Sequence, residues 1–289
     1  MQLRSPASAS GIGSGTTRRT LANVLLHLVL ILGAVITLTP LVWMISASFM
    51  PAGGANTIPP RFLPRDPTLA QYVILFTRLN LARHFLNSAL VTVVATIVSV
   101  LVNAMAGYAF AKLRFPGRDR IFQRLALALV VPAQVGMLPL FLLLRQLGLV
   151  NTFAGVMIPY FASIYGIFLI RQYALGVPDE LLDAARVDGA GEFRIFWMIV
   201  LPVIRPILVT LAAFTFLSAW NDFMWPLIIL SDSAKYTLPV ALANLSGEHV
   251  QDTELMMAGS VGTIVPALIV FLVFQRSFVR GIMAGSIKG

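Results

Sequence analysis

Residues 85–109 read FLNSALVTVVATIVSVLVNAMAGYA and contain no charged side chain. About 20 consecutive apolar residues allow an α-helix to cross the hydrocarbon core of a bilayer. Because lipid offers no hydrogen-bond partner to an open backbone, such a segment has to be a helix unless it belongs to a closed barrel. This stretch therefore predicts a transmembrane helix.

Five more apolar stretches of similar length lie on either side of it. They are residues 24–47, 125–144, 153–170, 203–220 and 257–274. Of the 289 residues, 58% are hydrophobic and 11% are charged, whereas a soluble domain has about 25% charged residues. This composition excludes a soluble enzyme, a disordered tail and a fibrous repeat. It predicts an all-α polytopic membrane protein with six transmembrane helices.

The basic residues predict how the chain is oriented. With the N-terminus in the cytoplasm, 15 of the 21 lysines and arginines fall in cytoplasmic segments. The six on the other side are Arg61, Arg65, Arg78, Arg83, Arg145 and Lys235. Because cytoplasmic loops carry the excess of basic residues, both termini are expected in the cytoplasm. The same clustering explains the net charge of +9, so we expect no nucleic-acid partner.

The composition of the segments outside the predicted spans indicates how the rest of the chain is divided. Residues 1–20 are rich in Ser, Gly and Thr, and predict a disordered cytoplasmic N-terminus. Residues 21–84 would hold the first transmembrane helix and the first extracytoplasmic loop, 85–275 the core, and 276–289 a cytoplasmic tail. The first apolar run exceeds the 7–15 residues of a signal peptide and further spans follow it, so we expect a retained helix.

No energy source or metal site is visible in the sequence. There is no cysteine, and the three histidines lie far apart. The three lysines precede Leu113, Tyr236 and Gly289, so no Gly-Lys-[Ser/Thr] phosphate loop exists. No charge falls in the middle of a predicted span, whereas ion-coupled carriers usually keep ionisable groups there. ATP hydrolysis is therefore supplied by another polypeptide, or transport is passive.

A stripe of uncharged polar residues runs along the 85–109 helix at helical spacing. It consists of Ser88, Thr92, Thr96, Ser99 and Asn103, and Gln134, Tyr160, Asn221 and Asp222 are candidates to join it. Such groups suit hydrogen bonding to a neutral, hydroxyl-rich solute in a translocation pathway. The alternative is interhelical hydrogen bonding and small-residue packing, which is common in membranes.

The cytoplasmic segment 176–202 reads GVPDELLDAARVDGAGEFRIFWMIVLP. Pro178 suits the first helical position, and Asp179 and Glu180 oppose the positive end of the helix dipole. Gly189 is placed to end this short helix in the left-handed conformation. A second helix follows, with an apolar face of Phe193, Phe196, Trp197 and Val200. The sequence predicts a helix–turn–helix outside the membrane; an amphipathic pair lying in the interface is the alternative.

This segment resembles the cytoplasmic EAA loop of binding-protein-dependent ABC-transporter permeases. The family pattern is Glu-Ala-Ala, three residues, Gly, nine residues, Ile-x-Leu-Pro. Here Asp183-Ala184-Ala185, Gly189 and Ile199-x-Leu201-Pro202 match the spacing, with Asp183 in place of the family's Glu. Residues 87–90, 109–115, 220–227, 236–239 and 274–281 are similar to the carbohydrate-uptake branch, specifically its maltose-type second permease.

The resemblance implies a type I ABC importer permease in a prokaryotic inner membrane, with no catalytic site and no cofactor of its own. ATP and Mg²⁺ would bind to two copies of a cytoplasmic ATPase. A second, different permease subunit and an extracytoplasmic solute-binding protein would complete the assembly. A passive channel or self-sufficient carrier and a membrane scaffold remain as alternative functions.

The resemblance also implies that the EAA loop docks in a groove of the ATPase as a coupling helix. Leu182 and Ala185 would supply apolar docking area, Asp183 a charge contact to a basic partner residue, and Gly189 the turn. The full set of candidate coupling residues is Glu180, Leu182, Asp183, Ala184, Ala185, Arg186, Asp188 and Gly189.

Overall fold

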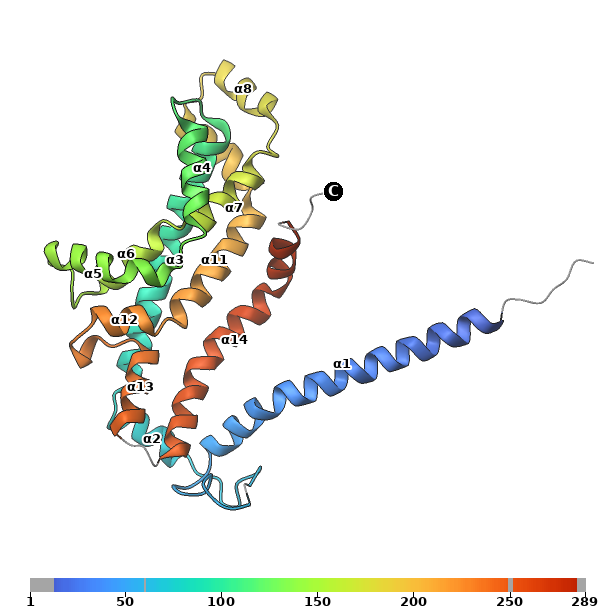
Figure 1. Ribbon diagram of the computed structural model, residues 1–289, viewed down its shortest axis with the longest axis vertical. Coiled ribbons are helices and arrows are strands. Elements are labelled where there is room, and N and C mark those ends of the chain that lie inside the picture. The colour runs from blue at the N-terminus through green and yellow to red at the C-terminus, as the bar shows by residue number, and fades with distance from the viewer. Residues whose placement is uncertain (1–12, 60, 249–251, 285–289) are drawn as a thin grey trace, which may run out of the picture.

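The computed structural model describes residues 13–59, 61–248 and 252–284, and within these residues every regular element is helical (Figure 1). The elements are α1 (Gly13–Ser48), α2 (Ala70–Thr77), α3 (Leu81–Lys112), α4 (Arg118–Ala128), η1 (Ala133–Gly136), α5 (Met137–Gln146), α6 (Phe153–Phe161), α7 (Ile164–Ala174), α8 (Asp179–Val187), α9 (Glu192–Ile195), η2 (Phe196–Val200), α10 (Leu201–Val203), α11 (Arg205–Trp220), α12 (Met224–Ile229), η3 (Ser233–Lys235), α13 (Leu238–Glu248) and α14 (Thr253–Ala284). The all-helical fold class is confirmed.

Four helical segments in the described part of the chain are long and apolar enough to cross a membrane. They are Leu21–Ser48, Leu81–Lys112, Phe153–Ala174 and Thr253–Gln275. Two bent pairs, α4 with η1–α5 and α9–α10 with α11, raise the number to six if each pair is one span. The six predicted stretches coincide with these segments and pairs.

The third predicted span is not one straight helix. Its two halves, α4 and the η1–α5 segment, meet at 100°. Pro132 stands at the break with extended backbone angles, φ −60° and ψ 133°. Proline has no N–H to donate and disfavours the helical conformation of the residue before it, here Val131. Pro132, which lies inside the predicted stretch 125–144, therefore explains why the helix breaks there.

The second helix of the cytoplasmic segment also differs from the prediction. A π turn, η2, follows α9, and a further bend of 81° separates this part from α11. Phe196 and Val200 are buried as predicted, but Phe193 and Trp197 are exposed and Ile195 takes their place inside. A π turn bonds residues five apart, and within it Phe196 and Val200 face inward while Trp197 does not.

The bundle is built around α3, which contacts α6, α7, α11 and α13. One apolar cluster lies at the α8 end and includes Tyr108, Ile170, Leu182 and Phe196. Another lies at the opposite end, between α2, α3, α13 and α14, and includes Leu81. In Figure 1 the helix α8 stands at one end of the bundle, and α2 and α13 lie at the other.

Helix α1 leaves the bundle and contacts it only near its C-terminal end (Figure 1). Met44 and Ala47 are buried there, while the apolar side chains from Leu21 to Leu38 are exposed. The helix begins at Gly13, inside the segment 1–20 that was expected to be disordered. Once a long apolar helix has formed, adding turns costs little because propagation is easier than nucleation. Residues 1–12 lie outside the described residues.

Candidate functional site

Helix α8 is formed and ended by the residues that the sequence singled out. Pro178 is its N-cap, one position earlier than predicted, and Asp179 and Glu180 occupy the first turn. Gly189 has φ +81°. Its N–H donates to Arg186 O at 3.0 Å, and the N–H of Ala190 donates to Ala185 O at 2.9 Å. These two bonds form a Schellman motif, which needs a left-handed residue at this position.

The start of α8 is fixed to the end of α3 by Lys112. The Lys112 ammonium pairs with Asp179 Oδ1 at 2.7 Å and donates to Val177 O at 2.6 Å. The Lys112 side chain is 6% exposed. This ion pair holds the pKa of Asp179 below its usual value. Sequence reasoning missed Lys112 as a site residue, although it is the basic residue in the last turn of α3.

The end of α8 is held by a second group of polar contacts. Arg186 pairs with Asp183 Oδ1 at 2.6 Å and with Glu192 Oε1 at 2.7 Å. Tyr108 of α3 donates its hydroxyl to Glu192 Oε2 at 2.7 Å. The hydrogen bonds that Arg186 donates to Glu192 and Asp183 raise its pKa above the usual value. Asp183, expected to contact a basic partner residue, thus already has a partner in its own chain, yet its side chain stays 68% exposed.

The apolar side chains of α8 divide between two faces. Leu182 is 1% exposed and packs in the cluster with Tyr108 and Phe196. Leu182 and half-buried Ala185, both expected on the docking face, form the inner face that attaches α8 to its own chain. Leu181 and Val187 are exposed instead, at 50% and 88%. Glu180, Ala184 and Asp188 are exposed beside them.

The polar stripe of α3 faces the interior of the chain. Ser88 accepts a hydrogen bond from Leu238 N at 2.7 Å. Asn103 donates to Ser99 O and accepts from Ser163 N at 2.9 Å, and a Cβ on Gly166 would lie 2.9 Å from Asn103 Cγ. These contacts support the alternative of interhelical hydrogen bonding and close packing. The buried hydroxyls of Thr92 and Thr96 have no partner within the described residues.

The other candidate pathway residues are spread over the molecule. Tyr160 of α6 donates its hydroxyl to Asp222 Oδ2, and Asp222 Oδ1 accepts from Trp225 N at 3.3 Å. Asn221 bonds back to Leu217 O in its own helix, and Gln134 is exposed in η1. The structure thus brings Tyr160 and Asp222 together but does not join Gln134 or Asn221 to the stripe. Among the described residues, no group of three His, Asp or Glu side chains could hold a metal ion.

A comparison with protein families decides what kind of chain this is. Residues 104–283 match the family model described as "Binding-protein-dependent transport system inner membrane component". The chain belongs to this family. It is a multi-pass permease of the bacterial inner membrane, a component of a binding-protein-dependent ABC importer in which partner subunits hydrolyse ATP. The predicted resemblance to binding-protein-dependent ABC-transporter permeases is confirmed.

Individual relatives agree with this assignment. The permease is 40% identical over 259 residues to the arabinooligosaccharides transport system permease protein AraQ of Halalkalibacterium halodurans, covering 89% of this chain and 93% of the relative. It is 34% identical over 277 residues to the lactose transport system permease protein LacG of Rhizobium radiobacter, covering 94% and 99%. It also resembles a chain in the crystal structure of a bacterial ABC transporter that imports the acidic polysaccharide alginate, with a TM-score of 0.80, 26% identity, and coverage of 93% and 100%.

Proposed function

We propose that this permease imports a carbohydrate and that the outer face of α8 receives the force of the ATPase. Relatives transport arabinooligosaccharides, lactose, diacetylchitobiose and alpha-glucosides by their descriptions, which supports a sugar or oligosaccharide as the solute. The observation that carries the coupling role is the attachment of α8. Its inner face is fixed to α3 while its outer face is free.

The mechanism follows from that attachment. Closure of the ATPase on ATP would move α8, and Lys112 and Tyr108 would pass the movement directly to α3. Because α3 contacts α6, α7 and α11, these helices would turn together between inward- and outward-facing states as a rigid body. The docking contacts would come from Leu181, Val187 and the exposed oxygen atoms of Asp183, with Glu180, Ala184 and Asp188 around them.

The partners follow from the same surfaces. Two copies of a cytoplasmic ATPase would bind ATP and Mg²⁺, one of them on α8. A second, different permease subunit would cover part of the exposed α1, and an extracytoplasmic solute-binding protein would dock at the α2–α13 end. Both termini would lie in the cytoplasm. In the pathway, the Tyr160–Asp222 pair would shape the outer mouth, and the α3 stripe would hold the bundle together.

Purification of the assembly tests the proposal. The wild-type permease, expressed with its genomic neighbours, should bring down an ATPase, and deleting residues 178–190 should abolish this. Reconstituted wild-type complex should take up one of a panel of labelled saccharides only with ATP. Uptake without ATP would instead support a passive channel, and an unchanged yield of ATPase after the deletion would refute the role of α8.

A further inference from the structure

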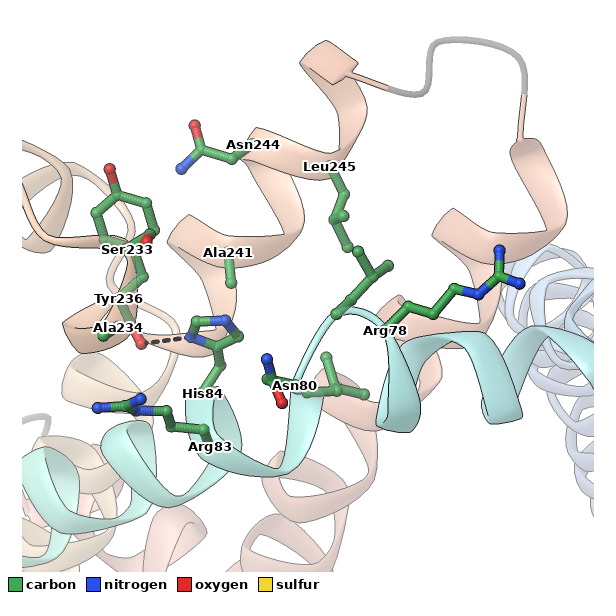
Figure 2. A pocket seen from close by; sticks show the side chains of 12 residues that line it. Arg78, Asn80, Arg83, His84, Ser233, Ala234, Tyr236, Ala241, Asn244 and Leu245 are labelled. Carbon is green, nitrogen blue, oxygen red and sulfur yellow. Dashed lines mark hydrogen bonds between the residues drawn. The ribbon is translucent and has the colours of Figure 1, made fainter.

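A cavity of about 520 Å³ (Figure 2) lies at the α2–α13 end of the bundle, which is opposite α8 in Figure 1. Its lining comes from the corner between α2 and α3, from the η3 turn and from α13. Figure 2 shows the guanidinium groups of Arg78 and Arg83 at opposite rims, with Asn80 and His84 between them. The cavity is therefore polar and basic, and it is separate from the coupling loop and from the α3 stripe.

Hydrogen bonds between α3 and the η3 segment hold one wall of this cavity in place. His84 Nδ1 donates to Tyr236 O at 3.1 Å, and Asn87 Nδ2 donates to Ala234 O and Tyr236 O, both at 3.0 Å. Leu81 and Leu245, which also line the cavity, belong to the apolar cluster that contains Leu238. The cavity suits a group that enters from outside and stays attached to something larger.

The charge of the cavity is not neutralised within the described residues. Arg78 and Arg83 are exposed, and neither forms an ion pair with a side chain that the structure describes, a set that leaves out residues 246–251. Three acidic side chains of the outer segments are already engaged: Asp222 with Tyr160, Asp232 with Lys235, and Glu254 with Ala55 N. The N-terminal end of α3, whose N-cap Asn80 makes no side-chain capping bond, adds partial positive charge.

These outer arginines also run against the orientation rule. Basic residues favour the cytoplasmic side of a membrane protein, so arginines on the outer face need another reason to be there. A guanidinium forms strong, directional hydrogen bonds with a carboxylate. We propose that this cavity receives an acidic segment of the solute-binding protein, whose carboxylates pair with Arg83 and Arg78. The inference rests on the proposed function and names the chemistry of its docking partner.

The test uses the complete reconstituted transporter and the solute-binding protein recovered with it in the purification above. The measured quantity is the concentration of that protein which gives half-maximal stimulation of ATP hydrolysis. Arg78→Glu combined with Arg83→Glu should raise this concentration about tenfold at low salt and weaken its dependence on salt, because rim charges govern encounter. ATP hydrolysis without the binding protein should not change. Arg78→Gln with Arg83→Gln should give a smaller rise.

Arg61→Glu combined with Arg65→Glu is the matched control, since these outer arginines do not line the cavity. An equal effect of the control pair, or no effect of the cavity pair on a stimulated transporter, would overturn this inference but leave the proposed function intact.

A second experiment adds galacturonate, an acidic sugar, as a competitor and asks whether the cavity binds solute instead. If it inhibits uptake in wild type but not in the cavity variants, the cavity binds solute and the inference is wrong. A wild-type transporter that no binding protein stimulates would overturn the proposed function itself.

Discussion

Gly189 shows how one backbone angle positions a whole loop. Its φ of +81° is reached easily only without a side chain, and no atom would touch a Cβ there. The strain of a substitution would therefore come from the backbone alone. Without the Schellman turn, the carbonyls at the end of α8 lose their partners and the chain cannot turn toward Glu192 and the rest of the polar group.

Gly189→Val should abolish ATP-driven uptake while the permease remains in the membrane. The left-handed angle costs a residue with a side chain about 1–2 kcal/mol, and a β-branched residue fits it worst. Gly189→Asn should keep most of the activity because asparagine tolerates this region. Gly191→Ala is the control, since Gly191 has φ −71° and open space around it. Uptake at the wild-type rate by Gly189→Val would contradict the assigned turn.

Lys112 links the coupling loop to the central helix through one nearly buried ammonium group. Its carboxylate partner Asp179 has a lowered pKa. The stabilisation from this pair is present above the unfolded-state pKa of Asp179, about 3.9, and is lost as the pH falls through the lower folded-state value. The pair therefore persists at neutral pH.

Lys112→Met should reduce the number of solute molecules transported per ATP severalfold, with the ATPase still bound. The change removes the ion pair and leaves the Val177 carbonyl without its donor, so movement of α8 no longer reaches α3 directly. Asp179→Asn should have a weaker effect because Lys112 keeps its backbone acceptors. Parallel measurement of uptake and ATP hydrolysis in proteoliposomes checks both variants. Full coupling in Lys112→Met would show that α3 receives the movement by another route.

At the scale of the element, the two faces of α8 predict two different phenotypes. Leu182→Ala removes a fully buried side chain and should destabilise the loop by about 2–5 kcal/mol, seen as faster proteolysis in the 176–202 segment. Leu181→Ala combined with Val187→Ala should leave that protection unchanged and weaken recovery of the ATPase in pull-downs. If the exposed pair altered proteolysis and left ATPase binding intact, the assignment of the faces would be reversed.

Elements defined by local signals could be predicted from the sequence, and those defined by their surroundings could not. The helix α8, its acidic first turn and its stop at Gly189 depend on neighbouring residues and were predicted correctly. The burial of Leu182 depends on Tyr108 and Phe196, which lie 74 and 14 residues away in sequence, so spacing alone could not assign its face. The bend at Pro132 has a local cause, but it was not predicted. The span 125–144 was assigned by counting apolar residues, and such a count does not register that a proline interrupts the helix.

The same division holds for the candidate sites. The polar stripe of α3 has the spacing of a lining face, yet its members bond to Leu238 and Ser163 of neighbouring segments. A membrane helix uses the same residue types for packing and for a pathway, so only the tertiary contacts separate the two. The basic outer cavity joins residues about 150 positions apart. Its arginines stood out only as exceptions to the orientation rule.

At the scale of the whole molecule, α1 has more apolar surface than its own chain covers. Only 6% of its spanning window is buried, although the helix is anchored to α14 at its C-terminal end. A helix held at one end by this chain and otherwise bare suits a bundle completed by a second subunit. Covering this surface with lipid would be about as favourable as covering it with a second subunit, because lipid tails are as apolar as leucine. Labelling therefore has to distinguish the two.

Single-cysteine scanning of residues 24–42 should show a face protected by the second permease, which the absence of native cysteine makes practical. In the assembled transporter, positions on one stripe with a period of 3.6 residues should resist a lipid-soluble thiol reagent and should crosslink to the other permease. The permease expressed alone is the control, and there all positions should react alike. Uniform labelling in the complete assembly, without crosslinks, would mean that α1 faces lipid on every side and that the second subunit packs elsewhere.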